Sequence, residues 1–136
     1  QYDDCDALVM AAAVSDYRPA VRAENKIKKE QHDHLNIELT ENPDILYGLG
    51  QKKTHQFLVG FAAETRDVIE YGKAKLAKKN LNLLVANDVA QQGAGFNVST
   101  NIAALIYKDG HIEQYPKMTK DDLGHIIIEK IVEGIN

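Results

Sequence analysis

The sequence has few of the features that define several large protein classes. It contains a single cysteine, Cys5, so no disulfide can form within the chain, which fits a reducing cytoplasm. No apolar run reaches the roughly 18 residues that a membrane helix needs, and no secretory signal peptide is present. The formal net charge of −4 gives no reason to expect nucleic acid as a partner. The composition therefore predicts a cytoplasmic protein that binds neither membranes nor nucleic acid.

Several motifs of catalysis are also missing. The sequence has no G-x-G-x-x-G, no P-loop and no G-x-S-x-G elbow. Tyr71 and Lys75 have the spacing of the catalytic pair of short-chain dehydrogenases, but the Gly-rich loop and the serine shortly before the tyrosine are absent. An NAD(P)-dependent dehydrogenase therefore remains only an alternative. His32 and His34 lie close together in a polar segment without a nearby cysteine, so metal binding is not expected there.

The 136 residues are enough for one domain, 1–136, with a real core. Short apolar segments predict three buried strands of a parallel sheet, at residues 7–14, 57–63 and 81–86. Two further strands, 102–107 and 111–115, flank a turn with glycine at Gly110 and predict a hairpin. Together with the helices below, this order predicts an α/β, Rossmann-like fold: a mostly parallel three-layer sheet with an antiparallel hairpin.

Three helices are predicted from capping residues and periodicity. The first runs from Asn42, as N-cap, to about Lys53, with Pro43 and Asp44 in its first turn. The second covers 66–79 after a Thr65 cap, with Asp67 in its first turn and one apolar face formed by Val68, Ile69, Gly72 and Leu76. The third follows a Thr119 cap, and its buried stripe is expected to consist of Leu123, Ile127, Ile131 and Ile135.

Between the first two apolar strands, residues 18–34 are polar and charged and predict a mobile loop. The alternation at 35–39 predicts a short strand with one polar face. A second long loop, 89–100, contains glycines and is long enough to suggest a function. The first element comes almost at once after Gln1, and no Met opens the chain, so we expect a fragment whose preceding element is missing.

Polar residues follow all three buried strands, at Ser15-Asp16, Glu64-Thr65 and Asn87-Asp88. Ligands of open α/β sheets bind beyond the carboxyl ends of the strands, so these ends point to one crevice. The lysines near the crevice could neutralise a triphosphate, or they could be separate surface charges; they are Lys26, Lys28, Lys29, Lys75 and Lys79. The start of the first helix could hold an anion or only be capped, and Phe61 could stack on a base or belong to the core.

Several motifs in one order carry a family resemblance. They are AAAVSDYRPA, NKIKK, NPDIL, VGFAAET, KLAKKNLNLLVANDV and a Gly-Phe-Asn loop. Together they resemble the phosphopantothenoylcysteine synthetase family, the domain that is often fused behind a decarboxylase in bacterial coenzyme A biosynthesis. The match covers nearly the whole chain, and several motifs in register are far more specific than any single one.

The resemblance implies a ligase that joins 4′-phosphopantothenate to L-cysteine at the expense of CTP. In this family the substrate carboxylate attacks the α-phosphorus of CTP, and the amine of cysteine then displaces CMP from the acyl-cytidylate. Mg²⁺ is expected because nucleoside triphosphates normally carry it. The resemblance also implies a homodimer, to which the hairpin could contribute, and a fused or associated decarboxylase. A fragment that binds the nucleotide without catalysis is the alternative.

The resemblance assigns roles to individual residues. Asp16 resembles a nucleotide-contacting aspartate, and Lys26 resembles the lysine of a flap, at about 18–34, that closes over the intermediate and serves the second half-reaction. Phe61 would border the base, and Lys75 and Lys79 resemble phosphate-contacting lysines. Three residues would line the nucleotide through main chain: Met10, Ala11 and Ala12. The residues that would approach CTP at the start of the first helix are Asn42, Pro43, Asp44, Ile45 and Leu46.

One departure from the family concerns the start of the chain. The family has a Gly-rich opening segment and an active-site asparagine that have no counterpart here. Asn87 and Asn97 do not match that asparagine by motif. We therefore expect this chain to hold much of the nucleotide site, to lack part of the catalytic apparatus, and to leave one edge of its sheet exposed.

Overall fold

The computed structural model describes residues 1–28, 34–64, 66–88 and 100–136. The chain forms two compact units. The first consists of residues 1–11 and 46–136, and the second consists of residues 12–45.

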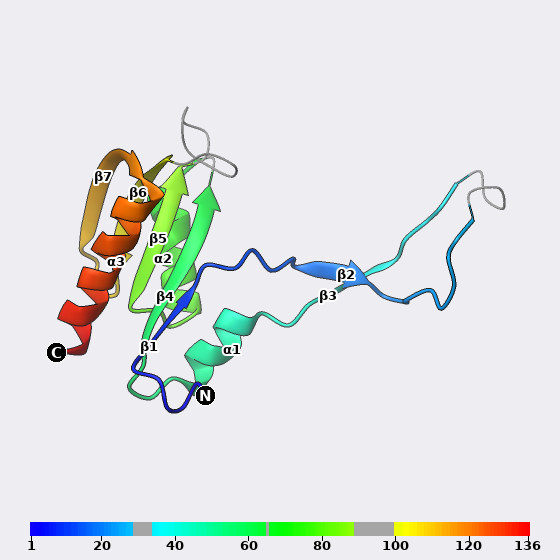
Figure 1. Cartoon of the computed structure of the whole chain (residues 1–136), viewed down its shortest axis with the longest axis horizontal. Coiled ribbons are helices and arrows are strands. Elements are labelled where there is room, and N and C mark those ends of the chain that lie inside the picture. The colour runs from blue at the N-terminus through cyan, green and yellow to red at the C-terminus, as the bar shows by residue number, and fades with distance from the viewer. Residues whose placement is uncertain (29–33, 65, 89–99) are drawn as a thin grey trace. The chain divides into compact units, whose positions relative to one another are not determined.

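The first unit is built on a five-stranded sheet with the order β1-β4-β5-β6-β7 (Figure 1). Strands β1, β4 and β5 run parallel, whereas β6 and β7 form an antiparallel hairpin added beside β5. The strands are β1 (Ala7–Met10), β4 (Phe57–Glu64), β5 (Leu83–Asp88), β6 (Thr100–Tyr107) and β7 (Ile112–Thr119).

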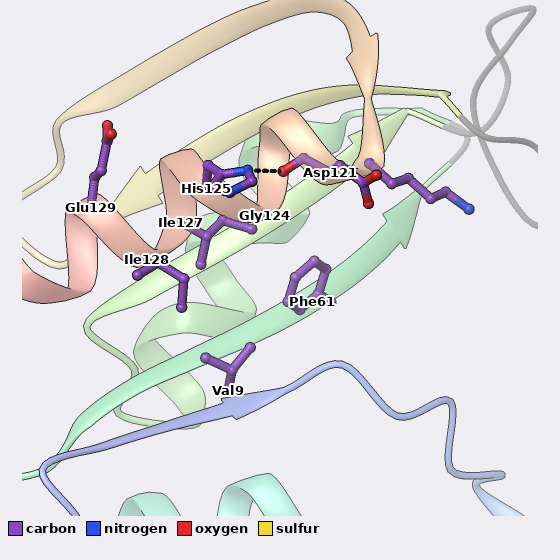
Figure 2. Close-up of a pocket in the computed structure, with 9 residues that line it drawn as sticks. Val9, Phe61, Asp121, Gly124, His125, Ile127, Ile128 and Glu129 are labelled. Atoms are coloured by element: carbon purple, nitrogen blue, oxygen red, sulfur yellow. Dashed lines mark hydrogen bonds between the residues drawn. The ribbon is translucent and has the colours of Figure 1, made fainter.

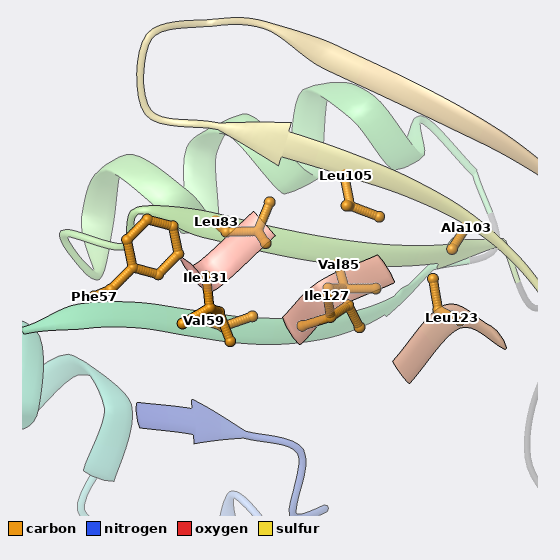
Figure 3. Close-up of a cluster of buried hydrophobic side chains, with 9 residues drawn as sticks. All are labelled: Phe57, Val59, Leu83, Val85, Ala103, Leu105, Leu123, Ile127 and Ile131. Carbon is orange, nitrogen blue, oxygen red and sulfur yellow. The ribbon is translucent and has the colours of Figure 1, made fainter. Parts of the chain in front are cut away.

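Helices cover both faces of this sheet. One face carries α2 (Val68–Lys78) and, through Leu46, α1 (Ile45–Lys52). The other face carries α3 (Lys120–Ile135), whose residues Leu123, Ile127 and Ile131 pack on the strands. Figure 3 shows this second cluster, with side chains of β4, β5 and β6 turned toward α3. The predicted three-layer α/β fold with an antiparallel hairpin is confirmed.

The apolar runs behave differently at the centre and at the edge of the sheet. β4 and β5 are buried on both faces, as predicted, because helices cover them from both sides. β1 ends at Met10, so the prediction of a buried strand as far as residue 14 was wrong. β1 pairs with β4, no described strand pairs with its other side, and Val9 is 41% exposed. An edge position leaves one side of a strand open, however apolar its residues are.

The hairpin and α3 follow the predicted local chemistry. Gly110 has φ = 92°, which only glycine adopts readily, and it closes the turn between β6 and β7. The side chain of Thr119 caps α3, because its Oγ1 accepts a hydrogen bond from Asp122 N at 3.1 Å. Ile135 was predicted to be buried and is 47% exposed. The neighbouring Gly134 already lies against Phe57, the first residue of β4, so Ile135 extends past the sheet.

Helix α2 presents the predicted apolar face to the sheet, since Gly72 and Leu76 are buried and Val68 and Ile69 pack beside them. Its N-cap is Asp67, in a left-handed conformation with φ = 48° and without a side-chain capping bond. The predicted cap, Thr65, lies outside the described residues.

The second unit contains a two-stranded antiparallel ribbon. Strand β2 (Tyr17–Pro19) pairs with β3 (Leu39–Glu41), and Tyr17 stands opposite Glu41. The predicted strand at 35–39 was therefore wrong except at its last residue, and the predicted loop 18–34 begins inside β2. The alternation of apolar and polar residues at 35–39 indicated an extended segment, but the pairing with β2 decides which residues form hydrogen-bonded strand pairs. Residues 29–33 lie outside the described part of the chain.

The first helix also starts later than predicted. Helix α1 begins at Ile45, and Asn42 is not its cap, because the Asn42 side chain forms hydrogen bonds within the second unit.

None of the described helices is both long and apolar enough to cross a lipid bilayer.

Candidate functional site

Two of the three polar strand ends lie side by side. β4 and β5 are in parallel register, with Ala63 opposite Asn87 and Glu64 opposite Asp88. The prediction that these strands finish at a common edge is therefore confirmed. The third end, Ser15-Asp16, belongs to the second unit.

Lys75 is tied to this edge by an ion pair. Its Nζ lies 2.5 Å from Oε1 of Glu64, the last residue of β4, and the Glu64 side chain is only 18% exposed. A half-buried carboxylate that holds a lysine keeps the ammonium in one place. In the described structure, Glu64 already balances the Lys75 charge that the sequence assigns to a phosphate.

Lys79 lies one helical turn beyond Lys75. Its backbone N–H donates to the Lys75 carbonyl at 3.0 Å, and it forms the C-cap of α2. Helix α2 starts after the carboxyl end of β4 and finishes before the amino end of β5. Lys79, at the end of α2, therefore lies toward the amino ends of these strands, away from the ends that carry Glu64 and Asp88. The i, i+4 spacing predicts that the two lysines share one face of α2. Along that face Lys79 lies one turn farther than Lys75 from the carboxyl end of β4.

Phe61 points away from these lysines. It packs with Val59 and Val85 on the face that α3 covers, and it lines a groove there (Figure 2). Helix α2 lies on the other face, together with Met10 and Leu46. The structure thus divides the predicted residues of the first unit between the two faces, and a ligand that reached both groups would have to cross the end of β4.

In the second unit, Asp16 and Asn42 are brought together although 26 positions separate them in the sequence. Asn42 N–H donates to the Asp16 carbonyl at 2.7 Å, and Asn42 Nδ2 donates to the Ser15 carbonyl at 2.8 Å. Arg18 Nη1 donates both to Asn42 Oδ1 and to the Glu41 carbonyl, each at 2.9 Å. These bonds fasten the two predicted nucleotide-binding motifs to each other.

Arg18 is the residue that sequence reasoning missed. It stands in the segment SDYRP, inside the motif that carries the resemblance, but only the pairing of β2 with β3 shows that it reaches Asn42. An arginine with several fixed N–H donors is suited to such bridging. The remaining predicted residues of this unit are Ala12, Lys26, Pro43, Asp44 and Ile45; Lys26 is exposed, and Ala11 belongs to the first unit after β1.

A charged cluster away from the predicted residues joins the hairpin to α3. Tyr115 donates to Glu113 at 2.5 Å, and Lys130 Nζ lies 3.3 Å from the same carboxylate. The Tyr115 hydrogen bond, with help from Lys130, lowers the pKa of Glu113, and burial raises the pKa of the adjacent Tyr107. This cluster links β7 to α3.

A protein metal site needs several oxygen, nitrogen or sulfur ligands close together. Among the residues with described positions, no set of three or more His, Cys, Asp or Glu side chains is arranged to hold a metal ion. His34 is described and His32 lies outside the described residues.

Comparison with known proteins gives a consistent picture. Residues 1–135 match the family model of the DNA/pantothenate metabolism flavoprotein C-terminal domain. The chain is 47% identical over 130 residues to the coenzyme A biosynthesis bifunctional protein CoaBC of Bacillus subtilis, and 45% identical over 124 residues to that of Escherichia coli K12. These alignments cover 96% and 89% of this chain but 32% and 30% of the relatives, so the chain spans about a third of their length.

Solved structures agree. The crystal structure of the C-terminal domain of a coenzyme A biosynthesis bifunctional protein CoaBC matches with a TM-score of 0.71 and 37% identity, over 96% of this chain and 55% of that one. A DNA/pantothenate metabolism flavoprotein from Streptococcus pneumoniae shares the fold, with a TM-score of 0.75, 22% identity and coverage of 100% and 64%. The chain therefore belongs to the family of the DNA/pantothenate metabolism flavoprotein C-terminal domain, and the resemblance carried by its motifs is confirmed.

Proposed function

We propose that this chain is the nucleotide-binding part of a phosphopantothenate–cysteine ligase, which uses CTP to join 4′-phosphopantothenate and L-cysteine in coenzyme A biosynthesis. The observation that carries the proposal is the match of nearly the whole chain, at 45–47% identity, to relatives named for coenzyme A biosynthesis. The alternative of a dehydrogenase has no comparable support, because its motif is limited to Tyr71 and Lys75.

The proposed reaction has two steps. The carboxylate of 4′-phosphopantothenate attacks the α-phosphorus of CTP, a P–O bond to pyrophosphate breaks, and an acyl-cytidylate forms. The amine of cysteine then attacks the acyl carbon, the C–N bond forms, CMP leaves, and the amine loses a proton. Both steps depend on neutralising and positioning anions more than on a strong acid or base.

The charged residues of the chain suit these steps. Lys75 would bind a phosphate group at the carboxyl end of β4, where Glu64 would release or share its ammonium when the phosphate arrives. Lys79, one helical turn farther along α2, would have to reach back along the helix to bind a second phosphate group. Asp16 and Asn42 would act as one preformed unit toward the nucleotide, since Arg18 and main-chain bonds hold them together. Phe61 would border the base from the opposite face at the end of β4, and Lys26 would serve amide formation.

Magnesium is part of the proposal as the partner of the triphosphate. Mg²⁺ commonly keeps several waters and binds through substrate phosphates with one or two carboxylates. The carboxylate at the nucleotide motif that fits this role is Asp16. The ion would spread the charge of the transferring phosphoryl group.

Two features of the assembly belong to the same proposal. The relatives are named as bifunctional proteins, and the chain matches about a third of each, so a decarboxylase on the same polypeptide or in the same complex is proposed. We also propose a cytoplasmic homodimer. Such a dimer, to which the hairpin could contribute, would also cover the exposed apolar side chains of Val21 and Ile37 in the second unit.

The test compares Lys26 with Lys52, a lysine outside the candidate site. Full-length protein should form the amide from 4′-phosphopantothenate, cysteine and CTP. Lys26→Ala should slow amide formation about 100-fold or more while CTP affinity changes little, because the lost charge acts in the second step. Lys52→Ala, at an exposed lysine outside the candidate set, is the control and should stay close to wild type.

A binding-only role makes a different prediction. Calorimetry on residues 1–136 with CTP and with ATP should show a preference for CTP. Equal affinity for the two nucleotides would remove the cytidine preference, and a full-length protein that forms no amide with CTP would contradict the ligase.

A further inference from the structure

Glu64, the last residue of β4, turns its side chain to the face of the sheet that carries α2. Side chains alternate along a strand, so Ala62 and Glu64 share this face, whereas Phe61 packs with the cluster under α3. Only 18% of the Glu64 side chain is exposed, although a carboxylate without a partner normally stays in water. Its partner in this position is the ammonium of Lys75.

The ion pair of Glu64 and Lys75 differs from an exposed ion pair within α2. Lys75 Nζ lies 2.5 Å from Glu64 Oε1, whereas Lys73 Nζ lies 3.5 Å from Glu70 Oε1. The Glu70 side chain is 78% exposed, so water screens that pair and it contributes little. A short contact to a carboxylate that is mostly covered is a charge-assisted hydrogen bond, which is much stronger. A ligand that takes Lys75 from Glu64 must therefore replace a strong interaction.

The position of this pair determines which part of a nucleotide could reach it. In the proposed function the base lies beside Phe61, on the α3 face of β4 (Figure 2). Lys75 lies on the other face, where Glu64 holds it. A nucleotide that begins at Phe61 and crosses the carboxyl end of β4 reaches Lys75 with the phosphates that are farthest from the base. These are the β- and γ-phosphates, which leave as pyrophosphate.

The arrival of these phosphates exchanges one partner of Lys75 for another. In the free protein the Glu64 carboxylate neutralises the Lys75 ammonium. In the complex a phosphate oxygen takes that place, and the Glu64 carboxylate is left beside a second negative charge. Like charges repel more strongly where water is partly excluded. The ligand therefore gains less from Lys75 than it would gain from a lysine without a carboxylate partner.

We propose that Glu64 is a positioning residue that releases Lys75 to the triphosphate and takes it back when pyrophosphate leaves. The inference rests on the proposed function, because it requires Lys75 to bind the terminal phosphates of CTP. A contact that stabilises bound substrate and bound product equally slows release and does not accelerate the chemical step. Glu64 weakens such a contact, and it holds the ammonium where the phosphates arrive.

Calorimetry on the full-length protein tests the exchange with three ligands: CTP, pyrophosphate and CMP, each with Mg²⁺. Without 4′-phosphopantothenate, CTP binds and does not react. Glu64→Gln keeps the size of the side chain and removes its charge. We expect CTP and pyrophosphate to bind this variant about 10-fold more tightly, the lower end of what one charge-assisted hydrogen bond contributes. CMP carries only the α-phosphate and should bind as it does to wild type.

Two further variants make the test specific. Glu70→Gln removes the exposed carboxylate of α2 and should change none of the three affinities by more than about 2-fold. In a Lys75→Met background, Glu64→Gln should tighten CTP and pyrophosphate at least about 3-fold less than it does with Lys75 present, because only direct repulsion by the carboxylate remains. Equal tightening in the two backgrounds would contradict the exchange of partners.

Two other outcomes would overturn the proposal. One is weaker or unchanged binding of CTP and pyrophosphate by Glu64→Gln, because Glu64 would then only support the structure around Lys75. The other is equal tightening of all three ligands, because the carboxylate would then repel any phosphate at the site.

Amide formation by the wild-type protein, measured on the same preparation, separates this inference from the proposed function. If the wild-type protein forms the amide with CTP and Glu64→Gln does not tighten CTP, the ligase stands and the role of Glu64 is wrong. If the wild-type protein forms no amide, both are wrong.

Discussion

The contact between α1 and the end of α2 can be tested with two glycines of the same helix. A Cβ at Gly50 would lie 2.0 Å from the Lys79 carbonyl oxygen and 2.9 Å from its carbon, whereas a Cβ at Gly48 meets nothing within 4 Å. Two hydrogen bonds fasten the same contact: Asn80 Nδ2 donates to the Gly50 carbonyl at 3.0 Å, and Lys53 Nζ donates to the Asn80 carbonyl at 2.8 Å.

The expected change in the free energy of unfolding has opposite signs for Gly48→Ala and Gly50→Ala. Alanine in place of glycine favours a helix by about 1 kcal/mol, which Gly48→Ala should gain nearly in full. Gly50→Ala gains the same amount but pushes against backbone, which cannot rotate away as a side chain can. Overpacking costs about 1–3 kcal/mol, and weakening the two hydrogen bonds costs about 1 kcal/mol each. Gly50→Ala should therefore be less stable than wild type by about 2–4 kcal/mol.

Urea denaturation of residues 1–136 measures both variants. The midpoint should fall for Gly50→Ala and rise for Gly48→Ala, with the m-value unchanged in both, because the surface exposed on unfolding stays the same. If Gly50→Ala proves as stable as Gly48→Ala, α1 does not dock on the Lys79 carbonyl and the contact described here is wrong.

Three further perturbations probe the core, a cap and an ion pair. Leu105→Ala in the α3 cluster should cost about 3 kcal/mol in urea denaturation, because Leu105 is fully buried, and a loss under 1 kcal/mol would contradict its packing. Thr119→Ala should cost about 1 kcal/mol by removing the cap of α3, and Thr119→Ser should restore most of it. The pKa of Glu113 is lowered by Tyr115 and then by Lys130, so its contribution to stability is present above the ordinary Glu pKa and is lost as the pH falls through the lower folded value. Glu113→Gln should therefore flatten the fall of stability below about pH 4.3, and an unchanged acid limb in a pH series of denaturation midpoints would argue against the assignment.

The central sheet could be predicted from the sequence because its signals are local. The run FLVGFAA is short, apolar and bounded by polar residues, and it became β4 with only the end residue added. Gly110 and Thr119 were equally predictable, since a positive φ and a helix cap each depend on one residue type at one place. What failed was the extent of β1, since burial of a strand depends on neighbours on both sides and a single segment reports on neither.

In the candidate site too, features set by local sequence could be predicted, and features set by distant residues could not. The lysines of α2 could be placed on one helix face from their spacing, but Glu64, the partner of Lys75, could not be predicted, because an ion pair between strand and helix requires the tertiary structure. Asn42 shows the limit most clearly. Its position before Pro43 favoured a helix cap, and tertiary hydrogen bonds to Ser15 and Arg18 took the side chain instead.

The hydrogen bonds of Asn42 to Ser15, Asp16 and Arg18 change how the nucleotide motifs should be understood. If Asn42 capped α1, it would report only on that helix, and its loss would cost helix stability alone. Because it joins the Ser15-Asp16 segment to the segment before α1, its loss should displace Asp16 as well. Arg18 connects this network to β3, because it also donates a hydrogen bond to the Glu41 carbonyl. Two motifs that appear independent in the sequence are thus one structural element, and a substitution in either is expected to impair the function of both.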